Sequence, residues 1–235
     1  MAELACDHHD MLQDKDIDPN MSIKEYDVML NDLLNEIPEN QWLEEPERTT
    51  MSKKITEEQV SKALCCTKDG TATGLDGCPY ELWKVLEKCH NKLQHQDTPS
   101  FNIIKVLTYL FQDVQEHSID NRTNFMTGWI CPLFKKKDPM DIRNYQPITL
   151  LNTDYKLLTK VLAIQLLNNA NQLVHLDQAG FIPNRSIFDH IRLAKAILNY
   201  TEVTKENSAI IVLDQEKAYD KIRHDYLWKT LEAFC

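Results

Sequence analysis

The chain has 235 residues, of which 43% are hydrophobic and 26% charged, and its formal net charge is −10. This composition excludes a chain that lacks a hydrophobic core. The length fits one large domain, or one domain with an extension. The charge argues against a nucleic-acid binder, but residues 1–60 hold 16 acidic and 5 basic residues, which leaves 20 acidic and 21 basic for the rest. The acidity therefore belongs to the first segment, and the overall charge says little about the remainder.

The cysteines indicate the redox compartment. Seven occur, none of them in a Cys-x-x-Cys pair, and their number is odd. No signal peptide is recognisable, and no apolar run reaches the roughly 18 residues that a membrane-spanning helix needs. These features predict free thiols in a reducing compartment, the cytoplasm or the nucleus, and no membrane partner.

Residues 1–50 are acidic and contain few large apolar side chains. Apolar residues recur at helical spacing between Tyr26 and Ile37, and Pro38 follows them, which predicts one amphipathic helix. We expect residues 1–50 to form a partly disordered connector with that helix. Residues 51–235 are expected to form the folded domain.

The next elements are predicted to be helices. Thr56 and Gln59 form a capping box, which predicts a short helix. A loop from Lys68 to Gly77 follows, and Pro79 suits the first turn of a second helix. Residues 100–116 carry apolar side chains at helical spacing and predict a core helix.

Two apolar runs, Trp129–Phe134 and Tyr145–Leu151, predict an antiparallel hairpin. Pro132 indicates that the first strand lies at a sheet edge. A charge cluster at a hairpin tip is usually only solvated, so the pattern alone predicts no binding site. The basic residues between the two runs are Lys135, Lys136, Lys137 and Arg143.

The following segment is expected to alternate helices with a loop. Asn152 or Thr153 is predicted to cap a mostly buried helix. Gln178–Arg185 is predicted to be a loop, and Ser186 to cap another helix. A last helix is expected around Tyr226–Phe234.

The run Ala209–Leu213 is apolar and mostly β-branched, and it ends at Asp214. Such a run predicts a strand that is covered on both faces. A carboxylate at the end of a buried strand can hold a hard cation such as Mg²⁺. From these residues alone a second interpretation is equally good, in which Asp214 caps a helix that begins soon after.

Four motifs, in this order, resemble those of reverse transcriptases from non-LTR (LINE-type) retrotransposons. They are GLDGCPYEL at 74–82, KKKDP with NYQPITLLN at 135–152, QAGFIPNRSIFD at 178–189 and LDQEKAYD at 213–220. Their order and spacing fit the family over most of the chain. Group II intron maturases are a related alternative, but LDQEKAYD favours the retrotransposon family.

The resemblance implies an RNA-directed DNA polymerase that transfers nucleotides by two-metal chemistry. The implied fold is α+β, with right-hand polymerase fingers and the start of the palm in residues 51–235. This fold is helix-rich and has an incomplete antiparallel sheet. The implied partners are an RNA template, a DNA primer and deoxynucleoside triphosphates.

The resemblance also implies a metal site and a nucleotide site. Asp214 and the backbone carbonyl of Gln215 correspond to ligands of Mg²⁺ or Mn²⁺. Lys135 or Lys136 is expected to contact the triphosphate as a flexible point charge. Tyr219 corresponds to the side chain that packs under the sugar, and its alternative role is a core aromatic.

Two further residues of the third motif are template candidates. Phe181 is expected to stack on a base and Arg185 to contact a phosphate. Structural packing is an equally good explanation for Phe181.

Departures from the family pattern predict weak nucleotide binding. Gln146 stands where the family has an arginine, which binds phosphate oxygens with two parallel hydrogen bonds. Loss of such a charge-assisted contact removes about 1.5–3 kcal/mol. Residues 69–74 also lack the lysine and proline of the family's loop. Residues 61–235 are nearly neutral in net charge, which is unusual for a protein that follows phosphate backbones.

The family's second acidic motif and its thumb have no counterpart in these 235 residues, which contain no Asp-Asp pair. We therefore expect a fragment without polymerase activity by itself, which a missing palm and thumb segment would complete. The alternative is a non-catalytic nucleic-acid-binding or partner-binding module on the same scaffold.

Overall fold

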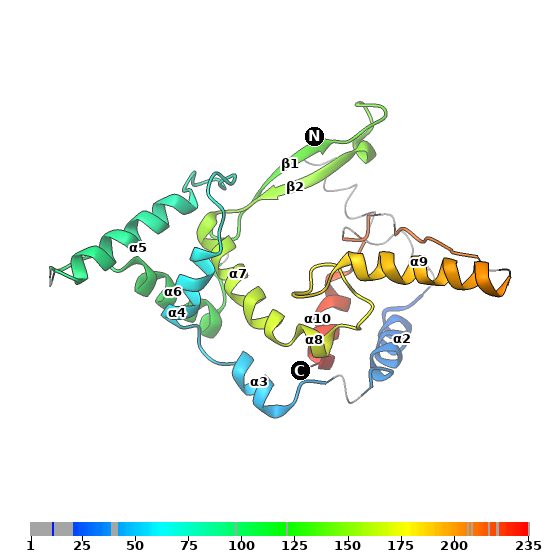
Figure 1. Ribbon diagram of the computed structural model, residues 1–235. Coiled ribbons are helices and arrows are strands. Elements are labelled where there is room, and N and C mark those ends of the chain that lie inside the picture. Colours follow the sequence, from blue (N-terminus) through cyan, green and yellow to red (C-terminus); the bar gives the residue numbers. More distant parts are fainter. Residues whose placement is uncertain are drawn as a thin grey trace. The chain divides into compact units, whose positions relative to one another are not determined.

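The computed structural model describes residues 11, 21–38, 42–96, 98–120, 122–205, 207, 209–215, 217–219 and 221–234. These residues form mainly helices, with one two-stranded antiparallel sheet (Figure 1). The predicted helix-rich α+β class is therefore confirmed. Within the described ranges, no helix is both long and apolar enough to cross a membrane.

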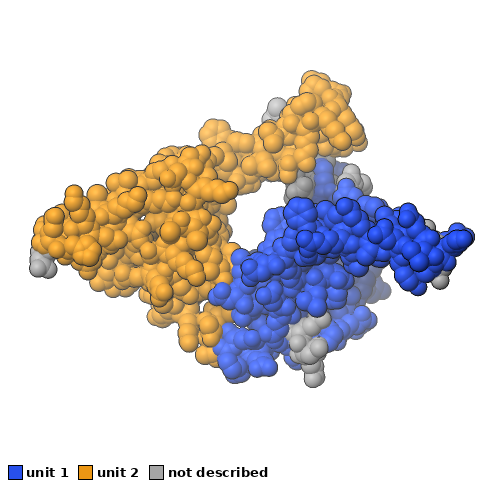
Figure 2. All heavy atoms as spheres, in the orientation of Figure 1, with its two compact units in different colours: residues 1–48, 167–235 blue, residues 49–166 orange. Residues whose placement is uncertain are grey.

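The chain divides into two compact units (Figure 2). Unit 1 consists of Met1–Arg48 and Leu167–Cys235, and unit 2 consists of Thr49–Leu166. Helix α3 (Glu45–Met51) and helix α7 (Thr153–Asn168) each contain a unit boundary.

Unit 2 is built from helices α4 (Glu57–Cys65), α5 (Tyr80–Gln94) and α6 (Ile103–His117) and most of α7. The predicted capping box is confirmed, because Thr56 and Gln59 each accept a hydrogen bond from the other's backbone N–H. Two glutamines of α6 also hold the backbone that enters α4. Gln115 accepts from the Ile55 N–H at 2.9 Å, and Gln112 donates to the Ile55 carbonyl at 2.6 Å.

The hydrophobic core of unit 2 lies among these helices. Burial of a Val, Leu, Ile or Phe side chain contributes roughly 1.5–3 kcal/mol to the free energy of folding. Phe111 is its largest fully buried member. The core consists of Ile55, Val60, Ala63, Leu64, Tyr80, Ile103, Ile104, Leu107, Phe111, Leu157, Leu158 and Val161.

The predicted hairpin is confirmed. Strand β1 (Trp129–Phe134) pairs antiparallel with β2 (Tyr145–Leu150), so that Trp129 lies opposite Leu150 and Phe134 opposite Tyr145. The short 3-10 helix η2 (Ile142–Asn144) leads into β2. In Figure 1 the hairpin extends away from the helices of unit 2.

Unit 1 contains α2 (Ile23–Asn35), α8 (Ala170–Leu173), α9 (Ile187–Thr204) and α10 (His224–Phe234). The helix expected in the acidic segment is present as α2, and it packs against α10. Lys229 of α10 pairs with Asp27 of α2 at 2.7 Å, and the guanidinium of Arg223 lies 4.9 Å from the Tyr26 ring centroid. The acidic segment thus contributes structure to unit 1.

The strand predicted over residues 209–214 is wrong. These residues have no regular secondary structure, and their side chains are exposed, from 56% at Ile210 to 90% at Leu213. A strand needs a neighbouring strand for its backbone hydrogen bonds. The sheet of the described residues contains only β1 and β2, so this run has no partner there.

Candidate functional site

The hairpin of unit 2 presents the candidate nucleotide-binding lysines. Lys135 and Lys136 directly follow β1 and are exposed, and the Lys135 N–H donates to the Asn144 carbonyl at 3.0 Å. Lys137 has a φ of 75°, a left-handed conformation that turns the chain at the tip. Among the described carboxylates, none forms an ion pair with these three lysines, so their charges are available to an anion.

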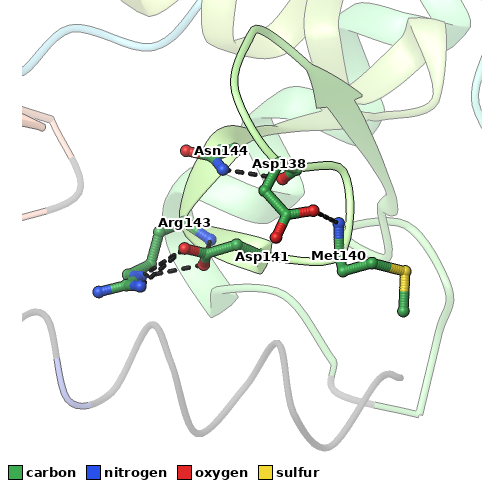
Figure 3. A network of polar contacts seen from close by, with 5 residues as sticks. All are labelled: Asp138, Met140, Asp141, Arg143 and Asn144. Atoms are coloured by element: carbon green, nitrogen blue, oxygen red, sulfur yellow. Dashed lines mark hydrogen bonds and ion pairs between the residues drawn. The ribbon is translucent and has the colours of Figure 1, made fainter.

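Polar contacts within the loop fix the shape of the tip (Figure 3). Asp138 accepts from the Met140 N–H at 2.9 Å, and its backbone carbonyl accepts from the Asn144 amide at 2.8 Å. The Tyr145 hydroxyl donates to the Pro139 carbonyl at 2.9 Å. The lysines are therefore carried on a loop with defined internal contacts.

Arg143 differs from the three lysines. Its guanidinium binds both carboxylate oxygens of Asp141, at 2.9 and 2.7 Å (Figure 3). This pairing raises the pKa of Arg143 above its usual range. Of the basic tip residues, only the lysines thus remain without a described acidic partner. The short Asp-x-Arg spacing is the sequence signal that could have indicated this pair.

Gln146 lies on β2 opposite Leu133, and its side chain is exposed. It shares the hairpin with Lys135 and Lys136, as the sequence predicted. At this place it offers an uncharged amide with two donors and an acceptor oxygen.

The template candidates of unit 1 lie in the loop before α9. Phe181 is 87% exposed and has a φ of 64°, so its ring is free of core packing. Arg185 is partly buried and donates to the carbonyls of Val174, His175 and Gln178 at 2.9, 2.5 and 3.0 Å. Arg185 therefore holds the end of α8 and the loop together, a structural role that the motif did not reveal.

The acidic candidate Asp214 and its neighbour Gln215 lie in the exposed segment after Leu213, and Tyr219 follows in a turn with 78% exposure. Tyr219 is thus not a core aromatic in this structure. The structure places these three residues in unit 1 and the lysine hairpin in unit 2.

The described residues do not by themselves fit a divalent metal site. Within the described ranges, no three His, Cys, Asp or Glu side chains are grouped so that they could hold a metal ion. Mg²⁺ requires nearly octahedral oxygen coordination, and a single exposed carboxylate with one carbonyl does not provide it. The other two acidic residues of the motif, Glu216 and Asp220, lie outside the described residues.

Comparison with known proteins supports one family. Residues 134–235 match the family model for reverse transcriptase (RNA-dependent DNA polymerase). That stretch contains all eight candidate site residues. The chain is also similar to the transposon TX1 uncharacterized 149 kDa protein of Xenopus laevis, with 31% identity over 190 residues. The match covers 81% of this chain and 14% of that protein, so the chain spans about one seventh of its curated relative.

Proposed function

Because this chain carries a reverse transcriptase domain of the non-LTR retrotransposon family, we propose that it supplies the nucleotide-binding hairpin and the first metal-binding carboxylate of an RNA-directed DNA polymerase. The main support is the match of residues 134–235 to the family. Reverse transcriptases generally use divalent metals and bind an RNA template, a primer and deoxynucleoside triphosphates. These are the cofactor and partners in the proposal.

The hairpin is proposed to bind the triphosphate. Lys135 and Lys136 carry compact charges on flexible side chains, which suits contact with the oxygens of a polyphosphate. Their exposure and the lack of a described acidic partner support this role. Gln146 on the adjacent strand adds neutral hydrogen-bond donors only.

Nucleotide binding by the 235-residue chain tests the role of the lysines. The double variant Lys135→Met, Lys136→Met should bind a deoxynucleoside triphosphate at least tenfold more weakly, because each charge-assisted hydrogen bond is worth about 1.5–3 kcal/mol. Lys88→Met removes an exposed charge from α5 in the same unit and should leave the affinity unchanged. Equal affinities for the double variant and the wild type would contradict the proposal.

Position 146 offers a gain-of-function test. Gln146→Arg should increase the affinity about tenfold, because the guanidinium adds a charged contact to a phosphate. Gln146→Glu places a carboxylate at the same point and should weaken binding. A Gln146→Arg variant with unaltered affinity would show that this strand does not contact the nucleotide.

We further propose that this chain does not extend a primer by itself. The support is that Asp214 is the only acidic candidate at the proposed metal position among the described residues. Primer extension on an RNA template should give no product with the chain and Mg²⁺. Extension that depends on Asp214, and is lost in Asp214→Asn, would overturn this part of the proposal.

The second candidate is a nucleic-acid-binding module without catalysis, which the exposed lysine tip favours. RNA binding measured against salt distinguishes it from an inert fold. Each phosphate contact should contribute about −0.7 to the slope of log K against log salt for a single strand. RNA binding with that slope, but without binding of a deoxynucleoside triphosphate, supports the module.

A further inference from the structure

We propose that the loop between α4 and α5 acts as a brace that sets the direction of the β1–β2 hairpin, with Thr153 and Asn152 as its positioning residues. The importance of this direction for nucleotide contact depends on the proposed function above. The brace itself is a geometric claim about unit 2 and can be tested without any activity.

Thr153 connects three elements through one hydroxyl group. Its side chain is fully buried at the start of α7. The hydroxyl accepts from the indole N–H of Trp83 on α5 at 2.8 Å and donates to the carbonyl of Cys78 in the loop at 2.8 Å. Since both hydrogen-bonding roles are filled, removal of this hydroxyl leaves the Trp83 N–H and the Cys78 carbonyl without their partner.

Asn152 joins the same loop to the end of β2. It is buried, and its side-chain oxygen accepts from the Asp76 N–H at 3.3 Å. Gly74 lies so close that a Cβ there would be 2.2 Å from the Asn152 oxygen and 2.5 Å from the backbone carbon of Leu151. The loop therefore touches the backbone at the hairpin base without an intervening side chain.

The other strand is fixed at its own base. Gly128, just before β1, approaches so closely that a Cβ would lie 2.4 Å from the Thr149 methyl carbon. Phe125, a few residues earlier, packs at the edge of the core with its ring 5.4 Å from that of Tyr155 on α7. The first contact joins the two strands at their base, and the second ties the chain before β1 to helix α7.

A fourth contact closes the loop over α7. The Lys156 ammonium donates to the Ala72 carbonyl at 2.7 Å and lies 5.7 Å from the ring centroid of Tyr80. Asn152, Thr153 and Lys156 thus all contact the loop from one stretch of five residues.

Beyond its base the hairpin has little support. Large apolar side chains on it are exposed, including 60% of Trp129 and 57% of Leu133. Lys135 follows Gly128 by seven positions, about 23 Å of extended chain, so a tilt of about 10° at the base displaces the tip by about 4 Å. That shift exceeds the length of a hydrogen bond, so the base determines whether the lysines reach a ligand.

The test measures the direction of the hairpin in the whole chain. Spin labels on ketone-bearing residues at Met140 and Lys88 report the distance from the tip to α5, and they leave the cysteines untouched. Both positions are exposed. Double electron–electron resonance should give one narrow distance distribution for the wild type.

Thr153→Val should at least double the width of that distribution. Thr153→Ser, which keeps the hydroxyl, should have the wild-type width. The matched control is Thr159→Val on the same helix, whose exposed hydroxyl donates only to the Lys156 carbonyl and should leave the width unchanged. Lys156→Met removes the hydrogen bond to the Ala72 carbonyl at the surface and should also broaden the distribution. It replaces Thr153→Val in the test if that variant does not fold. Folded Thr153→Val or Lys156→Met protein with the wild-type width would overturn the brace, whereas unchanged nucleotide binding with a broadened distribution would count against the proposed function alone.

Discussion

The two units differ in how much of their apolar surface they bury. Unit 2 contains a contiguous core around Phe111, Val60 and Leu157. In unit 1 only Leu30, Leu43 and Ala170 are buried among the described apolar residues, and neither α9 nor α10 contains a buried residue. Local caps and propensities are enough to define a helix, but burial needs neighbouring elements, which the described part of unit 1 provides only in part.

The largest difference should appear between two phenylalanines. Phe111→Ala removes the largest fully buried side chain of unit 2 and should cost about 3–5 kcal/mol in the free energy of unfolding. Phe188→Ala, on exposed α9, should change it by less than about 0.5 kcal/mol. Urea unfolding, with hydrogen exchange used to follow each unit, measures both, and similar losses would remove the distinction between the units.

The next test concerns the small buried part of unit 1. Leu30 on α2 is 3% exposed, and Leu30→Ala should cost about 2 kcal/mol in the free energy of unfolding. This is the lower end of the range for such changes, because Leu43 and Ala170 are the only other buried apolar residues in the described part of unit 1. Leu33→Ala on the same helix is the control, since Leu33 is exposed. Hydrogen exchange of α10 should rise in the first variant and not in the second, because α2 packs against α10. If Leu30→Ala changed neither the free energy of unfolding nor the hydrogen exchange of α10, α2 would not stabilise unit 1.

Two glycines allow a smaller comparison. A Cβ at Gly74 in unit 2 would overlap backbone atoms at the hairpin base, so Gly74→Ala should cost about 1–3 kcal/mol. A Cβ at Gly180 in unit 1 would meet only the end of a glutamine side chain at 3.6 Å. Gly180→Ala should therefore be neutral or stabilise by up to about 1 kcal/mol. Thermal unfolding of both variants decides whether tight packing is confined to unit 2.

The smallest effect concerns a half-buried carboxyl in unit 2. Burial, with a further contribution from Asp76, raises the pKa of Asp154. A raised pKa means that the folded state binds the proton more tightly, so this stabilising contribution is present at acidic pH and is lost as the pH rises through the folded pKa.

Asp154→Asn should therefore raise the melting temperature at pH 7 by a small amount, and this gain should shrink toward acidic pH. Asp32→Asn removes a carboxylate from an exposed position on α2 and serves as the control. A gain that is constant from pH 7 to pH 4 would exclude ionisation of Asp154 as its cause.

Much of the fold was predictable because its signals are local. The capping residues Thr56 and Ser186 fixed the starts of α4 and α9. Two apolar runs with a basic loop between them were sufficient to predict the hairpin and to place Lys135 and Lys136 at its tip. Each of these features depends on residues only a few positions apart.

Other features were not predictable because they depend on distant parts of the chain. Residues 209–214 have a strand-like composition, but a strand forms only where another strand is available to pair with it. The contact between Asp27 and Lys229 joins residues 202 positions apart and leaves no local pattern. The motif predicts that Arg185 contacts a template phosphate, whereas its carbonyl partners at the end of α8 are seen only in the structure.

The exposed run Ile210–Leu213 also affects how the protein can be produced. Short β-branched stretches without proline or charge are the segments from which cross-β fibrils assemble. With these side chains in water, newly synthesised copies of the chain can adhere to one another at this point. The Asp214 carboxylate at the end of the run opposes such stacking, as charged gatekeeper residues do, so replacing it for a functional assay also makes the preparation more prone to aggregate.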